Sequence, residues 1–226
     1  MRSPIEKKNQ LLNKDTPLTS RDKALFGYFG VDAKIKPPFR ILNPERLFIG
    51  DQTSIQEHCH INAFEDLSFL RDYIDPRYQR DFAKSEYRYD SRIEIGAQNQ
   101  IGRFFFVSCT KGILLEDNVL LSERVFLGDN NHSFTHPAVP IMQQPNKAGR
   151  AIRICYGSWV GVGAVILAGT HLGRLSVVGA NSVCKGRFPD HAVIGPEPAK
   201  LLFVRHPSAP AIQPRRSRSP AVKKRS

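Results

Sequence analysis

Residues 154–184 read ICYGSWVGVGAVILAGTHLGRLSVVGANSVC, and this stretch decides the fold. An apolar residue recurs at every sixth position, and a small residue follows four positions after each of the first five. A period of six matches neither the 3.6-residue period of a helix nor the two-residue period of an isolated strand. The apolar positions are Ile154, Val160, Ile166, Leu172, Val178 and Cys184, and the small ones are Ser158, Ala164, Thr170, Ser176 and Ser182.

The same period occurs in three shorter runs earlier in the chain. In each hexad, one short strand is followed by a turn at which glycine or another small residue lets the chain change direction tightly. Three hexads complete one coil, and stacked coils pair their backbones while the inward aliphatic side chains form columns. The repeat therefore predicts a mainly β protein built as a parallel β-helix with a triangular section. The earlier positions are Ile49, Ile55, Ile61 and Leu67, then Ile95, Ile101, Val107 and Ile113, then Leu115, Leu121 and Leu127.

The domain boundaries follow from the places where the repeat is interrupted. Residues 1–45 are expected to form an N-terminal arm, with a short helix capped by Thr19 or Ser20. The β-helix is predicted over residues 46–206, with an insert at 68–92 and an extruded, proline-containing loop at 128–151. Function is expected in loops extruded from a rigid solenoid.

The composition fits one globular domain with extra arms. The 226 residues are 41% hydrophobic and 24% charged, which excludes wholesale disorder and collagen-like repetition. The 33 basic and 21 acidic residues give a net charge of +12, and the tail at 207–226 supplies six of these charges without any acid. This tail holds almost no aliphatic residues to bury, so it is expected to be disordered.

Other sequence features bear on the compartment. Four cysteines form no C-x-x-C pair, and the N-terminal stretch lacks the apolar core of a signal peptide. The longest apolar run is shorter than the about 20 residues that span a bilayer. These features predict a cytoplasmic protein with reduced thiols, whose basic tail associates weakly with anionic membrane surfaces at the inner face of the membrane.

Several motifs resemble those of the hexapeptide-repeat acyltransferases. The stretches WVG at 159–161, ILAG at 166–169 and VGA at 178–180 look like the W-I-G, I-x-P-G and I-G-A signatures of that family, and DNNHSFTHP at 129–137 looks like its D-x-N-H active-site loop. The resemblance covers roughly residues 95–205. It is closest to the galactoside/maltose O-acetyltransferase and xenobiotic acetyltransferase branch, and to O-acetyltransferases of bacterial surface polysaccharides. It implies a left-handed β-helix that transfers acetyl groups from acetyl-CoA to a hydroxyl of a sugar or a surface-polysaccharide precursor.

The resemblance also assigns roles to individual residues. A hydroxyl needs a base to remove its proton as it attacks a thioester, and histidine suits that role. The resemblance places His132 in that role. His136 could orient the loop, but an exposed loop histidine with no role is the favoured interpretation. The backbone N–H of Val162 is the implied donor to the oxyanion. The family forms homotrimers with acetyl-CoA in the groove between subunits, and no metal is implied. The implied cofactor-binding residues are Trp159, Val162, Ala180, Lys185 and Lys200.

Alternative interpretations stay open at this stage. A γ-class carbonic anhydrase shares the fold and binds zinc through three histidines, but His171 is the only coil histidine near the later repeats. A catalytically silent scaffold is the other alternative, and the D-x-N-H loop argues against it. The run His58-Cys59-His60 offers zinc ligands, although adjacent residues on a coil point in different directions. In the insert at 68–92, six basic and five acidic residues nearly cancel, so nucleic-acid binding is not expected.

Overall fold

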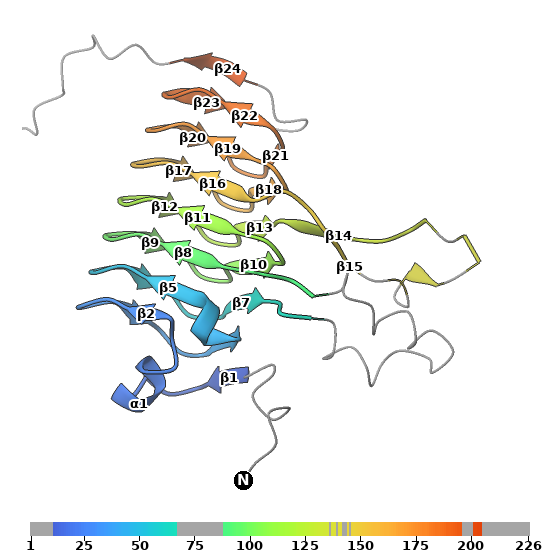
Figure 1. Cartoon of the computed structure of the whole chain (residues 1–226). Helices are drawn as coiled ribbons and strands as arrows, with labels where there is room; N and C mark the ends of the chain where they lie inside the picture. The colour runs from blue at the N-terminus through green and yellow to red at the C-terminus, as the bar shows by residue number, and fades with distance from the viewer. Residues whose placement is uncertain are drawn as a thin grey trace, which may run out of the picture.

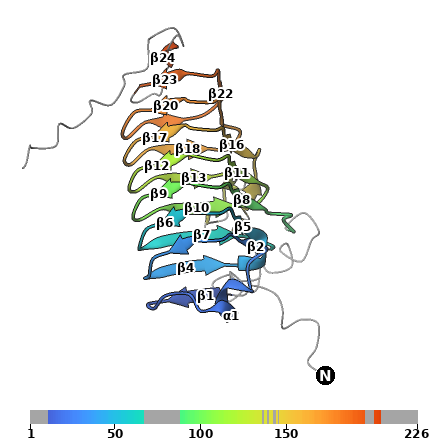
Figure 2. The same cartoon turned by 90° about the vertical axis from the view of Figure 1, so that its left-hand side faces the viewer.

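Short parallel strands wind into a three-sided β-helix in the computed structural model of the chain (Figures 1 and 2). The structure describes residues 11–66, 88–135, 137–138, 140–141, 144, 146–195 and 201–204. Each coil gives one strand to each of three sheets, in the order sheet 1, sheet 2, sheet 3. The corners between them are named by the sheets they join: 1–2, 2–3 and 3–1. No helix in the described part of the chain is long and apolar enough to cross a membrane.

The strands are short, as expected for hexads that alternate strand and turn. Sheet 1 contains β1 (Leu11–Lys14), β4 (Phe39–Leu42), β7 (Cys59–Ala63), β10 (Phe106–Cys109), β13 (Phe126–Gly128), β18 (Val165–Leu167) and β21 (Val183–Cys184). Sheet 2 contains β2 (Tyr28–Phe29), β5 (Leu47–Ile49), β8 (Ile93–Ile95), β11 (Ile113–Leu115), β16 (Ile152–Ile154), β19 (His171–Leu172) and β22 (Arg187–Phe188). Sheet 3 contains β3 (Lys34–Ile35), β6 (Ser54–Ile55), β9 (Gln100–Ile101), β12 (Leu120–Leu121), β17 (Trp159–Val160), β20 (Val177–Val178), β23 (Ala192–Ile194) and β24 (Leu201–Val204).

The six-residue positions form the core, which confirms the predicted β-helix. Within the described residues every one of these side chains is buried, while Leu67 lies outside them. Neighbouring coils place the same position in register, so the aliphatic groups stack in columns along the axis. Burying one such side chain stabilises the fold by about 1.5–3 kcal/mol. The pairs in the last coils are Ile154 with Leu172, Val160 with Val178 and Ile166 with Cys184.

The β-helix begins earlier than the boundary predicted at residue 46. Strands β2, β3 and β4 pair in parallel with β5, β6 and β7, so residues 28–42 already form a coil. The period was present there as Phe29, Ile35 and Ile41, with an aromatic residue at the first apolar position. The Pro37-Pro38 pair, which indicates a break in the sequence, lies at the 3–1 corner between β3 and β4. Proline is tolerated outside the strand ladders because it donates no backbone hydrogen bond.

Both ends of the solenoid carry an antiparallel strand. At the N-terminal end, β1 pairs antiparallel with β4, and at the other end β24 pairs antiparallel with β23. Between β1 and β2 lies the predicted short helix, α1 (Ser20–Lys23), with Thr19 as its N-cap in a capping box with Asp22. Hydrogen bonds from Lys14 and Thr19 lower the pKa of Asp22 to about 2. These segments cover the backbone edge groups that an open end would present.

Extra chain length is inserted at the 1–2 corner. This corner is two residues long between β21 and β22 and three residues long between β10 and β11. It widens to residues 64–92 between β7 and β8, and to residues 129–151 between β13 and β16, where the loop projects from the right-hand side of Figure 1. The 3–1 corner is tight by contrast, since a Cβ on Gly161 would come 2.7 Å from the backbone nitrogen of Ala180. A 3₁₀ helix (Pro44–Arg46) lies at the 1–2 corner between β4 and β5.

Candidate functional site

The loop predicted at 128–151 begins and ends as a two-stranded hairpin. Strands β14 (Asn130–His132) and β15 (Asn146–Ala148) pair antiparallel, with His132 opposite Asn146. At the base, the Gly149 N–H donates to the carbonyl oxygen of Asp129 at 2.8 Å. A Cβ on Gly149 would come 2.3 Å from that oxygen, so this position requires glycine. The hairpin presents His132 as an exposed side chain.

The carboxylate of Asp129 fixes the start of the hairpin. It is fully buried and accepts three backbone N–H groups of the neighbouring coil, from Thr110 at 2.7 Å, Lys111 at 2.9 Å and Gly112 at 2.8 Å. Such corner N–H groups have no partner in the strand ladder and need another acceptor. The Cys109 thiol lies 3.4 Å away, and burial together with the Asp129 charge raises the pKa of this thiol. The motif aspartate therefore has a structural role, because it fixes the start of the hairpin to the neighbouring coil.

Two further contacts hold the hairpin strands. The Asn130 amide donates to the carbonyl oxygen of Ser108 at 2.9 Å, which ties β14 to β10. The Tyr89 hydroxyl donates to the carbonyl oxygen of Asn146 at 2.7 Å, which supports β15 directly opposite His132. Tyr89 is buried, so both strands of the hairpin are tied to neighbouring parts of the chain.

A second group of predicted residues lies at the 3–1 corner. Residues Gly161 to Ala164 form a turn in which the Ala164 N–H donates to the Gly161 carbonyl at 3.2 Å, and Gly163 has a φ of +69°, as in a type II turn. The N–H groups of Val162 and Ala180 donate to none of the residues that the structure describes. The two positions stack on successive coils, since the Asn181 N–H donates to the Val162 carbonyl at 2.8 Å. This corner therefore offers a pair of adjacent backbone donors.

Trp159 lies beside this corner on the outer face of sheet 3. Its side chain is 47% exposed, and its indole N–H donates to the Ser122 hydroxyl at 3.0 Å. On the same sheet it pairs with Leu120, which is also exposed, and with Val177. An exposed tryptophan and leucine side by side form an apolar platform next to the two backbone donors.

The structure does not bring all of the predicted site residues together within one chain. His132 and Lys185 belong to segments at the 1–2 corner, whereas Trp159, Val162 and Ala180 lie at or beside the 3–1 corner. The outer face of sheet 1 separates the two groups and carries aromatic rings, with Phe106 and Phe126 stacked at 5.7 Å between centroids. Lys200 and His136 lie outside the described residues. Within one copy of the chain, the described site residues therefore lie in two groups at different corners.

The possible zinc run at His58–His60 is not arranged as one site. The Cys59 side chain is fully buried in the core, and burial raises the pKa of its thiol to about 12. His58 stacks on Phe104 at 4.9 Å, and His60 lies against Phe106 at 5.9 Å, both on the outer surface. Among the residues that could be described, no three His, Cys, Asp or Glu side chains are grouped as metal ligands.

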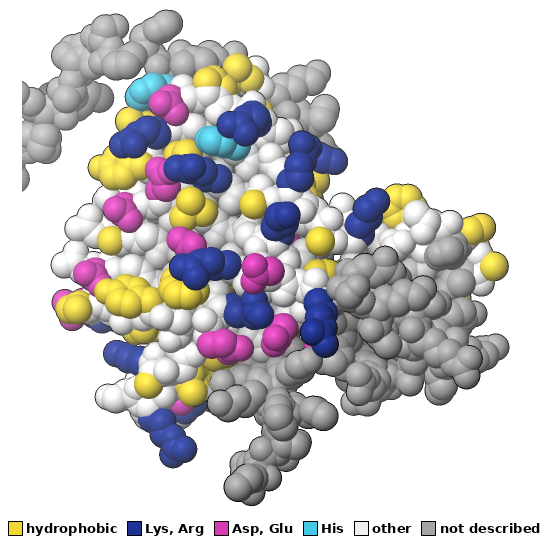
Figure 3. Space-filling view, in the orientation of Figure 1, with side chains coloured by type: hydrophobic (Ala, Val, Ile, Leu, Met, Phe, Trp, Pro, Cys, Tyr) yellow, Lys and Arg dark blue, Asp and Glu magenta, His cyan; other side chains and the backbone are white. Residues whose placement is uncertain are grey.

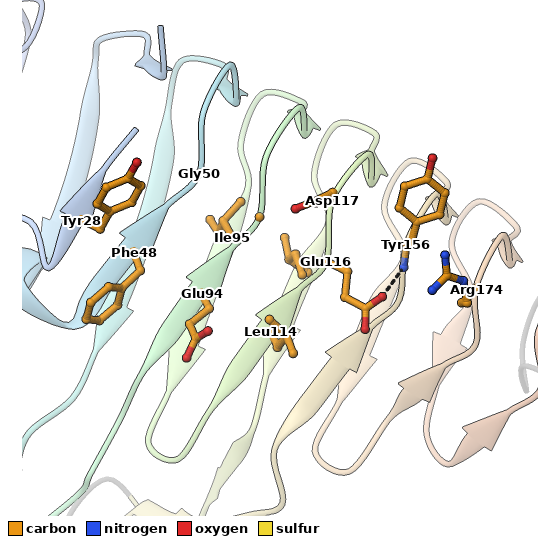
Figure 4. A pocket seen from close by; sticks show the side chains of 12 residues that line it. Tyr28, Phe48, Gly50, Glu94, Ile95, Leu114, Glu116, Asp117, Tyr156 and Arg174 are labelled. Carbon is orange, nitrogen blue, oxygen red and sulfur yellow. Dashed lines mark hydrogen bonds between the residues drawn. The ribbon is translucent and has the colours of Figure 1, made fainter. Parts of the chain in front are cut away.

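Sequence reasoning missed a groove on the outer face of sheet 2, the face turned toward the viewer in Figure 3. A cavity of about 520 Å³ there is lined by Tyr28, Phe48 and Tyr156 together with carboxylates (Figure 4). It shares Glu94 and Leu114 with a second cavity of about 780 Å³ at the 1–2 corner. The aromatic and charged residues of this groove fall between the hexad positions, where the sequence period carries no signal.

The carboxylates of the first cavity are held by neighbours. The Glu116 carboxylate accepts a hydrogen bond from the Arg153 guanidinium at 3.0 Å and from the Tyr156 N–H at 2.9 Å. Partial burial alone would raise the pKa of Glu116, but these two donors lower it below its usual value. Arg174 lies 5.0 Å from the centre of the Tyr156 ring. This end of the groove is therefore aromatic and acidic.

Known proteins resemble this chain in sequence over about half of its length. It is 31% identical over 110 residues, 46% of its length, to WbbJ of Escherichia coli (strain K12), which is named as a lipopolysaccharide biosynthesis O-acetyl transferase. It is 27% identical over 115 residues, 51% of its length, to Rv3034c of Mycobacterium tuberculosis (strain ATCC 25618 / H37Rv), which is named as an acetyltransferase. The matched region spans 56% of WbbJ and 36% of Rv3034c. No protein-family model matches the chain.

Solved structures share the fold over most of the chain. AntD, an N-acyltransferase from Bacillus cereus in complex with dTDP and 3-hydroxybutyryl-CoA, superposes with a TM-score of 0.64 at 17% identity, covering 85% of this chain and 92% of AntD. At this level of identity the likeness concerns the fold. The chain therefore has the hexapeptide-repeat β-helix fold and is similar in sequence to acetyltransferases, which confirms the resemblance predicted from its motifs.

Proposed function

We propose that the chain is an acetyltransferase that moves an acetyl group from acetyl-CoA to a sugar hydroxyl, with His132 as the general base. The observation that carries this proposal is the Asp129-anchored hairpin, which holds an exposed histidine on a rigid solenoid. The names of WbbJ and Rv3034c support acetyl transfer, and that of WbbJ supports oxygen as the accepting atom. A surface-polysaccharide precursor is the acceptor that this relative favours.

The chemistry needs one base and one donor. His132 takes the proton of the acceptor hydroxyl while its oxygen attacks the thioester carbonyl. The free N–H of Val162 donates to the oxygen on which negative charge develops, and a fixed donor of this kind lowers the barrier because it is already oriented. The carbon–sulfur bond then breaks, the proton passes from His132 to the sulfur, and an acetyl ester and free coenzyme A leave.

Two copies of the chain are needed to complete this site. His132 and the Val162 N–H lie at different corners of the prism, with the outer face of sheet 1 between them. We infer a homotrimer in which the hairpin of one copy approaches the 3–1 corner of its neighbour. Acetyl-CoA lies in the groove so formed, along Trp159 and the paired donors of Val162 and Ala180. Lys185 and Lys200 then serve the polar and phosphate groups of the cofactor.

The test is direct transfer by the purified chain. Free thiol released from acetyl-CoA is measured with simple glycosides and nucleotide-sugars as acceptors, for the chain and for His132→Ala. Thiol release that needs both an acceptor and His132 supports the proposal. Chelator-sensitive CO₂ hydration would instead support the carbonic anhydrase alternative, and the absence of both activities would favour the scaffold alternative.

A further inference from the structure

Two cations that pair with none of the described residues line the cavity at the 1–2 corner. This cavity of about 780 Å³ lies at the base of the hairpin and is bounded by Arg88, Lys111, Arg153 and Ala148 of β15. The side chains of Arg88 and Lys111 form no ion pair or hydrogen bond with any residue that the structure describes. Both residues are exposed. Exposed cations that line a cavity and form no ion pair within the described part of the chain are available to an anionic ligand.

The other charged groups of this cavity are already paired. Arg92 forms an ion pair with Glu94, and Arg153 forms one with Glu116. Asp90 also lines the cavity, and its carboxylate lies 3.6 Å from the Arg46 guanidinium. The described lining holds four cations, Arg88, Arg92, Lys111 and Arg153, against the two carboxylates of Asp90 and Glu94, which leaves a surplus of two positive charges. The adjoining aromatic end of the groove offers only Arg174 against Glu94, Glu116 and Asp117, so it does not suit an anion.

Lys111 is also coupled to the hairpin. Its backbone N–H is one of the three groups that the Asp129 carboxylate accepts, and the chain continues from Asp129 to His132. Ala148, the partner of Asn130 across the hairpin, lines the same cavity. A ligand held by Lys111 therefore lies at the foot of the loop that carries the proposed base.

We propose that Arg88 and Lys111 bind the diphosphate group of a sugar diphosphate ester. The acceptor of the acetyl group is then an activated precursor and not a finished glycan. A diphosphate diester carries two negative charges, which match the positive charges of Arg88 and Lys111, and phosphate oxygens are strong acceptors for Arg and Lys. The organic group of the ester extends past Leu114 into the aromatic end of the groove (Figure 4). The identity of the acceptor rests on the proposed function, whereas the diphosphate site does not.

Binding is tested by calorimetry at low salt without acetyl-CoA, using inorganic pyrophosphate, UDP and farnesyl diphosphate as probes. Pyrophosphate should bind the chain, and Lys111→Ala and Arg88→Ala should each weaken it by about tenfold, the loss expected for one charge-assisted contact. Lys34→Ala, an exposed lysine on sheet 3, is the matched control and should bind as the parent does. Circular dichroism confirms that each variant is folded.

The three probes separate the sources of the diphosphate. Tighter binding of UDP than of pyrophosphate assigns a nucleotide-linked precursor, and tighter binding of farnesyl diphosphate assigns a lipid-linked one. No binding of any probe, or binding that survives the Arg88→Ala/Lys111→Ala double variant, would overturn the site. If pyrophosphate binds through both residues but no thiol is released from acetyl-CoA, the diphosphate site stands and the acetyl-transfer proposal fails.

Discussion

The Asp129 carboxylate accepts the backbone N–H of Lys111 at 2.9 Å, and through this contact one buried side chain fixes two neighbouring coils at the 1–2 corner. On one side it holds the turn that carries Lys111, and on the other it starts the strand that ends at His132. A link of this kind would keep Lys111, the proposed ligand-binding cation, and His132, the proposed base, at constant separation, which favours reaction through orientation.

Asp129→Asn should destabilise the chain by at least about 2 kcal/mol. The carboxylate has two acceptor oxygens for the three backbone N–H groups, whereas an amide has one and turns its own N–H₂ group toward these donors. Urea unfolding followed by circular dichroism measures the change. Asp117→Asn is the control, since that exposed carboxylate accepts a single backbone N–H within the described chain, from Ala97 at 2.7 Å. Its cost should stay below about 1 kcal/mol. Equal costs for the two variants would contradict the anchoring role of Asp129.

His132→Ala should lower kcat by about 10²–10⁴-fold, the usual loss when a positioned base is removed. The free energy of unfolding should change by less than about 0.5 kcal/mol, because the side chain is exposed. Steady-state thiol release and urea unfolding provide the two measurements. His191→Asn, at a half-buried histidine outside the hairpin, should keep its activity. Near-normal transfer by His132→Ala would remove His132 from the mechanism.

Val162→Pro should abolish most activity while preserving the fold. Val162 occupies the second position of a type II turn, where proline is favoured, so the substitution removes only the N–H proposed to bind the oxyanion. The expected loss in kcat is about 10²–10³-fold. Val162→Ala keeps the N–H and should remain active. If both variants lose activity equally, the side chain rather than the backbone donor is what matters.

Mixing two inactive variants tests whether the site is shared between copies. Co-expressed His132→Ala and Val162→Pro chains should recover activity in about one quarter of the sites, since each site draws each half at random from two kinds of subunit in a symmetric oligomer. Thiol release by the purified mixture, against each variant alone, gives the result. A mixture as inactive as its components would place both groups in the same chain.

The free energy of unfolding should fall as the pH drops below about 6.5. Partial burial lowers the pKa of His171, with Arg187 and Arg153 adding to the effect, and burial also lowers the pKa of His60. Because the unfolded chain then binds protons before the folded one, this stability is present above the unfolded pKa and is lost on acidification. Unfolding of His171→Gln at about pH 7.5 and pH 5.5 should show a smaller loss than the parent. An unchanged pH dependence would rule out His171 as a contributor.

The sequence predicted the solenoid because inward positions carry a strict period, as Ile154, Val160 and Ile166 show. It placed the first coil outside the β-helix because Phe29 occupies an inward position where an aliphatic residue was sought. The hairpin and its histidine were predicted from a motif. The supporting contacts of Tyr89 and Lys111 were not, because both residues lie outside the repeat and meet the hairpin only after folding. The signal available in the sequence was the spacing between Val107 and Leu115, which is longer than the six residues of a hexad. It marks a wider 1–2 corner, whose backbone N–H groups need an additional acceptor.

Length variation confined to the 1–2 corner has a consequence for how this protein can diverge. Lengthening a surface loop there costs only loop-closure entropy, about 0.6 kcal/mol for each doubling, and leaves every column of the core intact. An insertion at the 3–1 corner would instead separate stacked backbones that approach within van der Waals distance at Gly161. New acceptor specificities can therefore be acquired one loop at a time, while the half of the molecule proposed to hold the acyl donor stays unchanged.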